Sequence, residues 1–327
     1  MLLKFFKRPL PRVFLAIVLL AILSWLKSFI SGEHLRFYFD DTPMPLYGLV
    51  TQLLGESILV QRLVAFSVLM LCAILLIQIN TKHILIKYRT YLPPLFFVLL
   101  SSSFLPLQRL TPALFAAVFL IISIDYILSA YSSKKPLDNF FKASFFIAVA
   151  SLFYFAASFY ILLVFISLII LRPPSIRDWL VSILGFITPW LFLVFYHYFF
   201  NDDIAYLANL LDMVSEPIGI SRFYGVLFTI FYSFSGLLLI ITLLFLIGSL
   251  TTQKISIRKY YSIFIWFLVI SAGVAFLSPF SSIEITYLAA IPSAFIFSNF
   301  FTFSSSRLWT EILFSILIII AVLMQFY

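Results

Sequence analysis

The chain has 327 residues, of which 63% are hydrophobic and only 10% are charged. A soluble protein of this length needs far more charge to cover its surface, so the composition excludes that class and indicates that the lipid bilayer is the solvent. The formal net charge of +8 follows from the positive-inside rule of membrane proteins and does not require nucleic acid as a partner. No polar stretch reaches the usual size of a soluble domain, so we expect one integral membrane domain over residues 1–327.

Long apolar runs without period-2 alternation predict membrane-spanning helices and exclude a barrel. The predicted spans are residues 12–30, 62–80, 91–106, 111–130, 142–155, 157–171, 179–200, 224–249, 261–278, 285–303 and 310–326. We therefore predict an all-α polytopic membrane protein, with a core at residues 1–200 and additional helices at 201–327. The 29 uncharged residues between Lys142 and Arg172 are long for one helix and short for two.

The distribution of charge decides between one helix and two in residues 142–171. With two helices and the N-terminus inside, sixteen of the 21 Lys and Arg residues lie on the inner side and nine of the 13 carboxylates lie on the outer side. A single helix would move every later loop to the opposite side and weaken this bias. We therefore predict eleven spans, with the N-terminus inside and the C-terminus outside.

The first outer loop, residues 31–62, carries four of the 13 carboxylates, including the adjacent Asp40 and Asp41. In the sequence LYGLVTQLLGE that follows, apolar residues recur at i, i+3, i+4, i+7 and i+8 from Leu46, which predicts an amphipathic helix lying along the membrane surface. The acidic pair could bind a divalent cation, with His34 as a further ligand, or supply a general base toward a hydroxyl. The alternative is that Asp40 or Asp41 only caps the helix.

Cationic residues on the outer side are disfavoured by the positive-inside rule, so each one needs a reason. The outer Lys and Arg residues are Lys27, Arg36, Arg62, Arg109 and Arg222. A lipid-linked phosphate supplies a reason, because a guanidinium can bind two phosphate oxygens at once. We expect Arg36, Arg109 and Arg222 to bind such a phosphate. Pairing with acidic residues of the segment 201–222, or with membrane lipid headgroups, is the alternative.

Asp125 is the one carboxylate that falls inside a predicted span. Acids within the membrane are often ion or proton sites, so a transporter centred on Asp125 is a third hypothesis. Asp125 is only about six residues from the cytoplasmic end of its span, however, where it could reach the interface or cap a neighbouring helix. The sequence also shows no repeated halves with broken helices, which transporters commonly have.

The first span, the acidic outer loop and the predicted interfacial helix resemble the GT-C superfamily of membrane glycosyltransferases. This resemblance covers residues 1–200 and implies that the catalytic acid is Asp40 or Asp41 and that the donor is a polyprenyl-phosphate sugar. Metal-using members often carry a second acidic motif in the next outer loop, whereas here SSSFLPLQRLTP contains only Arg109 as a charged residue. The runs KYRTYLPPLFFVLL and KKPLDNFFKASFFIAVASLFYF also resemble a multi-span inner-membrane family of Bacteroidota with no established activity.

Two functional hypotheses follow. In the first, the protein is a transferase of the bacterial inner membrane that moves a sugar or related group from an undecaprenyl-phosphate carrier to an acceptor in the cell envelope. Asp40 or Asp41 would be the base or metal ligand and the outer arginines would hold the phosphate, so the polar loops should meet in a deep outer cavity. In the second, the protein is a non-catalytic membrane subunit of an envelope assembly or export complex, and it presents an apolar stripe to a protein partner.

Overall fold

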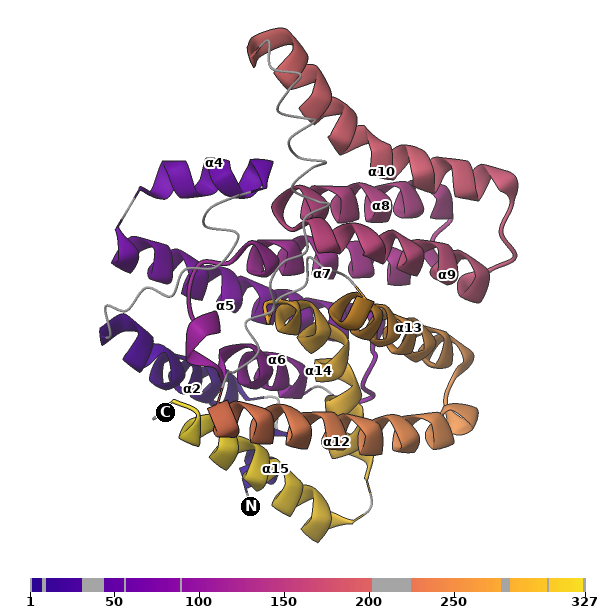
Figure 1. The fold of residues 1–327 in the computed structure, drawn as a ribbon. Helices are drawn as coiled ribbons and strands as arrows, with labels where there is room; N and C mark the ends of the chain where they lie inside the picture. Colours follow the sequence, from indigo (N-terminus) through magenta and orange to yellow (C-terminus); the bar gives the residue numbers. More distant parts are fainter. Residues whose placement is uncertain are drawn as a thin grey trace.

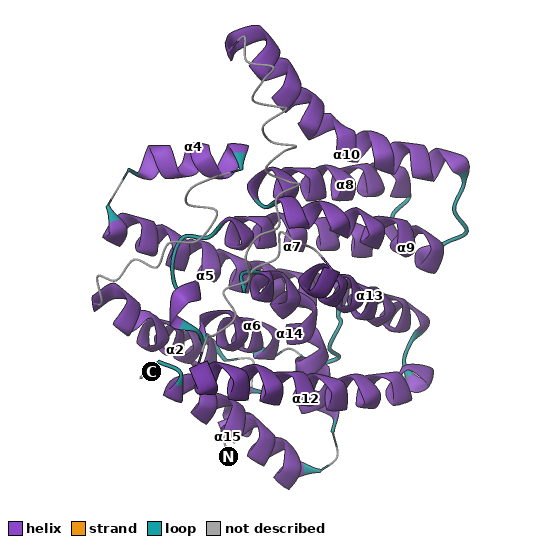
Figure 2. Ribbon diagram, in the orientation of Figure 1, coloured by secondary structure: helices purple, strands orange, loops and turns teal. Residues whose placement is uncertain are grey.

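A computed structural model describes the chain at residues 2–7, 10–30, 44–55, 57–88, 90–201, 225–277, 283–304 and 306–325. Within these ranges every regular element is a helix (Figure 2). The long helices lie side by side in one bundle with their axes roughly aligned (Figure 1). The predicted all-α fold class is therefore confirmed for the described residues.

Each predicted span coincides with a helix of the bundle. Those long and apolar enough to cross a membrane are α2 (Pro11–Ile30), α5 (Ile58–His83), α7 (Pro112–Ala130), α8 (Pro136–Phe153), α10 (Ile176–Tyr196), α12 (Gly225–Ser249), α13 (Ile255–Leu277) and α14 (Ile285–Phe303). Shorter apolar helices are α6 (Leu92–Ser102), α9 (Ile161–Leu171) with the preceding turn η2 (Phe155–Tyr160), and α15 (Arg307–Leu323). The remaining elements are α1 (Leu2–Phe6), α4 (Pro45–Leu54), η1 (Leu105–Leu107), η3 (His197–Asn201) and η4 (Leu250–Thr252).

The segment 142–171 forms two helices, as the charge distribution predicted. Helix α8 ends at Phe153, and Tyr154 has extended backbone angles (φ −139°, ψ 107°) before η2 begins. The indole of Trp190 in α10 donates a hydrogen bond to Ser151 at 3.0 Å, which fixes the last turn of α8 against α10. The chain therefore reverses at residue 154 without a polar loop, and for that reason hydropathy alone left this boundary undecided.

Local chemistry sets where several helices begin and end. Proline occupies the first turn of five of them, where its missing N–H has no intrahelical partner to lose, at Pro11, Pro45, Pro93, Pro112 and Pro136. Helix α10 begins with a capping box in which Ser175 and Asp178 bond to each other's backbone N–H groups. Helix α5 ends where Ile84 takes φ 49°, a left-handed conformation that few β-branched residues adopt.

Hydrogen bonds from helix side chains to loops and helix ends show which of these segments share an end of the bundle, and hence that the helices alternate in direction. At one end of the bundle, the loop after α6 accepts hydrogen bonds from α2, α4 and α14. At the other end, α13 donates to the loop after α5 and to the last residue of α9, and α5 contacts α7. We call the first of these the predicted outer end and the second the predicted inner end. The described loops lie at the end to which the charge distribution assigns them.

Helix α14 lies at the centre of the bundle. It packs against α6, α7, α12 and α13, and most of its side chains are buried. One hydrophobic core extends from Leu3 to Met324 and includes residues of nearly every helix. Residues 285–303 are thus central to the packing of the bundle.

Helix α4 forms where the amphipathic pattern predicted it, but its setting differs from the expected one. It packs against α8, and in Figure 1 it runs in about the same direction as α5 and α8, so it lies along the bundle and not across its end. Tyr47 is 2% exposed and anchors it, whereas Leu49 and Leu53 of the apolar stripe are 55% and 87% exposed. The hydroxyl of Tyr47, which periodicity does not reveal, therefore helps to set the orientation of this helix.

We expect Gly185→Ala to destabilise the bundle. A Cβ at this position of α10 would lie 2.5 Å from the carbonyl oxygen of Phe141 in α8, so the two helices would have to separate. Overpacking of this kind costs about 1–3 kcal/mol, which thermal unfolding of the purified protein would detect. Gly236→Ala in α12 is the matched control, because no atom lies within 4 Å of its added Cβ; an equal loss of stability in both variants would contradict the close α8–α10 packing.

Candidate functional site

Polar side chains gather at the predicted outer end around the loop that follows α6. The side-chain amide of Gln108 donates to the carbonyl oxygen of Ser102 at 2.6 Å and to Oε1 of Gln325 at 2.7 Å. The amide of Gln325 donates in turn to the carbonyl oxygens of Ser102 (2.9 Å) and Ser103 (3.2 Å). Gln108 is 1% exposed, so this network, which we call the Gln108 cluster, is held rigidly inside the protein.

Helices α2 and α5 bind to the Gln108 cluster from one side. The indole of Trp25 donates to the hydroxyl of Ser102 at 3.0 Å, and the hydroxyl of Ser28 donates to the carbonyl oxygen of Gln108 at 2.7 Å. Arg62, near the start of α5, donates to the carbonyl oxygen of Ser28. The last two turns of α2 therefore position a cation of α5 beside the cluster.

Two buried tyrosines fix the backbone of the same loop from the other side. The hydroxyl of Tyr47 in α4 donates to the carbonyl oxygen of Leu110 at 3.1 Å, and the hydroxyl of Tyr287 in α14 donates to that of Leu107. Both tyrosines are at most 2% exposed. Together with Ser28 of α2, which bonds to Gln108, these tyrosines hold the loop by donors from three different helices.

Two arginines lie near this loop. Arg62 is 8% exposed, and Arg109 lies close enough to it for their positive charges to repel each other. A fold that holds like charges near one another creates a local potential that attracts an anion. Guanidinium groups bind phosphate oxygens well, so the arrangement is suited to a phosphate group.

Glu284 brings a carboxylate to the same end. It precedes α14, is 1% exposed, and its side chain makes no capping hydrogen bond to that helix. It is close enough to Tyr287 for the two groups to interact electrostatically. In the sequence, Glu284 is one of the nine predicted outer carboxylates. It is also the sole acidic residue between positions 217 and 310, and this isolation is the feature that could have singled it out.

Several predicted site residues lie outside the described residues. These are His34, Arg36, Asp40, Asp41 and Arg222. The described residues on either side of the segment 31–43 are at the predicted outer end: Ile30 lines the groove described below, and α4 begins at Pro45, next to Tyr47. Of the predicted phosphate ligands, the structure describes Arg109. It lies near Arg62, which was not among the predicted ligands.

The predicted divalent cation has no test in the described part of the chain. Among the residues described, no three His, Cys, Asp or Glu side chains form a group that could hold a metal ion. Asp40, Asp41 and His34, the expected ligands, are outside that part. The described outer groups are amides, hydroxyls, guanidiniums and one buried carboxylate, a set suited to phosphate and hydroxyl groups more than to a hard cation.

An apolar groove of about 580 Å³ opens beside the Gln108 cluster between α2, α6 and α15. Away from the outer end it is lined by aliphatic side chains, including Leu20, Leu23 and Val98. Its polar lining residues are near the outer ends of the three helices: Ser24, Lys27, Ser102, Ser103 and Gln325. The groove and the Gln108 cluster therefore share residues and form one continuous feature.

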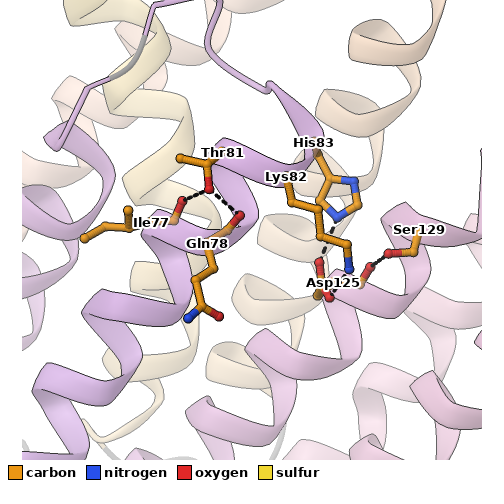
Figure 3. A network of polar contacts seen from close by, with 7 residues as sticks. All are labelled: Ile77, Gln78, Thr81, Lys82, His83, Asp125 and Ser129. Carbon is orange, nitrogen blue, oxygen red and sulfur yellow. Dashed lines mark hydrogen bonds and ion pairs between the residues drawn. The ribbon is translucent and has the colours of Figure 1, made fainter. Parts of the chain in front are cut away.

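A second polar network lies at the predicted inner end (Figure 3). Nζ of Lys82 is 2.6 Å from one carboxylate oxygen of Asp125, and Nε2 of His83 is 2.8 Å from the other. Figure 3 shows both side chains reaching Asp125 of α7 from the last turn of α5. The Asp125 side chain is 27% exposed and that of Lys82 is 53% exposed, so the pair lies at the rim of the bundle. Asp125 thus joins two helices, which supports the structural alternative to a transport site.

Aromatic contacts extend this inner network across the end of the bundle. The ring of His83 packs edge-on against Tyr260 with centroids 5.7 Å apart, and Tyr260 packs edge-on against Tyr131 at 5.8 Å. Nζ of Lys259 lies 5.4 Å from the ring centre of Tyr131 and donates to the carbonyl oxygen of Leu171 at 2.7 Å. These contacts join α5, α7, α9 and α13, and their role is to fix the helix ends.

We expect Asp125→Asn to reduce the free energy of unfolding by roughly 1 kcal/mol, because an exposed ion pair contributes up to about that amount. Function should be retained. Thermal unfolding measures the first effect, with Asp138→Asn, an exposed acid at the same end, as the control. Loss of function in Asp125→Asn at unchanged stability would move the functional site to the inner end and contradict the outer site.

Comparison with known proteins gives one match. A model described as a family of unknown function (DUF6427) matches residues 44–327. No curated protein and no solved structure matches the chain. The matched region includes the Gln108 cluster, Arg62, Arg109 and Glu284, and it excludes Asp40 and Asp41.

Proposed function

The chain belongs to this family of unknown function, and we propose that it is a membrane-embedded transferase that moves a sugar or related group from a polyprenyl-phosphate carrier to an acceptor outside the cytoplasm. The observation that carries the proposal is that Arg62, which bonds to Ser28, and Arg109, which follows Gln108 in the chain, both lie beside the Gln108 cluster, next to an apolar groove. A lipid-linked phosphate has both halves that such a site matches: an anionic head and an apolar chain.

The chemistry requires a base and a stabilised leaving group. The acceptor hydroxyl gives its proton to a carboxylate while its oxygen forms a bond to the sugar carbon that carries the phosphate. The bond between that carbon and the phosphate oxygen breaks, and the electron pair leaves with the polyprenyl phosphate. Guanidinium groups at the phosphate stabilise the charge that develops there, and the carboxylate raises the nucleophilicity of the acceptor.

Two sets of carboxylates could supply the base in this proposal. Asp40 and Asp41 are in the segment between Ile30 and Met44, and the GT-C resemblance implies that the catalytic acid is one of them. Glu284 is a described carboxylate at the same end, buried next to Tyr287. We assign the base to the aspartate pair and a supporting electrostatic role to Glu284, because a base must be reached by an incoming acceptor and Glu284 is only 1% exposed.

The proposal includes an orientation and a location. The predicted outer end faces away from the cytoplasm across the bacterial inner membrane, since the charge distribution favours an inside N-terminus. The donor is then a lipid-linked group that has already crossed the membrane, and cytosolic nucleotides are not used at the site. Transfer at this face builds a component of the cell envelope.

Depletion of the protein tests the proposal. We expect cells that lack it to accumulate a polyprenyl-phosphate-linked donor and to lose one glycan or glycolipid of the envelope, as measured by mass spectrometry of lipid extracts. Re-expression of the wild-type chain should restore both. Unchanged lipid-linked donors and unchanged envelope glycans in depleted cells would contradict a transferase.

One observation favours a second function, that of a non-catalytic subunit of an envelope assembly or export complex. Helix α10 contains Pro189 and, in Figure 1, its second half diverges from the bundle. There Leu191, Phe192 and Phe195 are 56–69% exposed and line a hollow of about 570 Å³ whose lining residues all belong to α10 and to η3, which follows it. The same depletion experiment separates the two functions, since a subunit predicts the loss of a membrane complex while lipid-linked donors stay at their normal level.

A further inference from the structure

We propose that the groove between α2, α6 and α15 binds the hydrocarbon chain of a polyprenyl phosphate, with the phosphate at the Gln108 cluster. The inference rests on the proposed function and names the place where the carrier lies. It also gives the route of entry: the chain enters sideways from the bilayer, between α2 and α15.

The first support is the shape of the groove. Its lining includes Val98, Leu99 and Ala321, which are 0%, 2% and 5% exposed, so the groove reaches the packed interior of the bundle. Leu15 and Leu19, on an open face of α2, are instead about 60% exposed, as expected for contact with ordinary bilayer lipid. A groove bounded by three helices encloses a chain on several sides, and the short side chain of Ala321 leaves the space that a chain would fill.

The second support is the change from apolar to polar lining toward the outer end. Ser102 and Gln325 line the groove there, and both are hydrogen-bonded to the Gln108 amide. Oε1 of Gln108 is itself buried and accepts no hydrogen bond from any residue that the structure describes. Buried acceptors are nearly always satisfied, so a further donor is expected at this atom. Lys27, Ser102 and Gln325 line the outer end of the groove, which is therefore suited to a polar, anionic head group.

The third support is charge. Lys27 lines the groove, the carbonyl oxygen of the next residue, Ser28, accepts a hydrogen bond from Arg62, and Arg109 lies near Arg62. Lys27 thus lies in the groove, and Arg62 and Arg109 lie beside the Gln108 cluster. After its sugar has been transferred, the carrier is a phosphate monoester and carries a charge between about −1.5 and −2 near neutral pH, more than the phosphodiester of a two-chain phospholipid. This difference favours the sugar-free polyprenyl phosphate as the occupant over a glycerophospholipid.

Native mass spectrometry of the full chain, with undecaprenyl phosphate or phosphatidylglycerol added at equal concentration, tests the inference. Leu23 lines the groove yet is 67% exposed, so Leu23→Trp fills the groove from its open side without disturbing the core. We expect Leu23→Trp and Lys27→Glu each to lower the bound fraction of undecaprenyl phosphate by roughly tenfold. Leu19→Trp on the same helix and Lys87→Glu at the predicted inner end are the matched controls and should bind as the wild type does.

The possible outcomes separate this inference from the proposed function. Equal binding by all four variants, or equal binding of phosphatidylglycerol and undecaprenyl phosphate by the wild type, overturns the inference. If depletion of the protein still removes an envelope glycan in that case, the transferase proposal stands without the groove. If undecaprenyl phosphate binds as expected but depletion changes no envelope product, the groove stands and the transferase proposal fails.

Discussion

Replacing Asp40 and Asp41 together with alanine is expected to lower the rate of transfer by roughly 10²–10⁴-fold, the usual contribution of a general base. The acceptor hydroxyl must lose its proton as its oxygen attacks, and the double variant removes the carboxylates that we assign to accept it. Stability should change little, because the elements on both sides of the segment 31–43 are held by Trp25 and Tyr47.

The measurement is the rate at which proteoliposomes consume the lipid-linked donor that accumulates in depleted cells. Asp138→Ala, which removes an exposed acid at the predicted inner end, is the control and should retain full activity. Glu284→Gln adds a second comparison, since a supporting electrostatic role predicts a loss of roughly tenfold or less. Full activity in the double aspartate variant, together with a complete loss in Glu284→Gln, would show that the base is Glu284 and that the assignment to Asp40 or Asp41 is wrong.

Arg109→Ala is expected to reduce kcat/KM for the lipid-linked donor by roughly 10²–10³-fold, a loss typical of removing one group that stabilises developing negative charge. Arg109→Lys should recover only part of the activity, because an ammonium supplies the charge without the bidentate geometry of a guanidinium. Arg109 is a better test than Arg62, since Arg62 also bonds to the carbonyl oxygen of Ser28 and its loss would disturb α2.

Arg258→Ala is the matched control for Arg109→Ala, because Arg258 is an exposed arginine at the predicted inner end. Both proteins should unfold at the wild-type temperature. Equal activity of the Arg109→Ala and Arg258→Ala variants would show that Arg109 has no part in binding the carrier phosphate.

The helices could be predicted from sequence because each of them has to satisfy a local requirement. A helix that crosses a bilayer needs about twenty apolar residues, and that requirement does not depend on which helices are its neighbours. Even the break at Tyr154, which no polar residue marks, followed from the charges on either side of it. What hydropathy could not give is the packing order, and α14 is the clearest case: it lies late in the chain and at the centre of the bundle.

The candidate site was less predictable because its contacts join distant parts of the chain. Gln108 and Gln325 are 217 positions apart, and nothing in the sequence indicates that these two side chains contact each other. Arg109 was chosen for its charge on the disfavoured side of the membrane, and that same argument applied equally to Arg62. Only the fold shows that these two arginines meet, and that Glu284 is buried at the same end.

Photo-crosslinking with an undecaprenyl phosphate that carries a diazirine on its chain would test the central claim most directly. In proteoliposomes, we expect the crosslinked peptides to come from the groove, at Leu20–Ile30, at 98–103 and at 321–325. Unlabelled undecaprenyl phosphate should compete for these sites better than inorganic phosphate does. Crosslinks that are spread evenly over exposed apolar faces, including residues 191–199 of α10 and η3, would contradict the claim that this end of the bundle binds a lipid-linked phosphate.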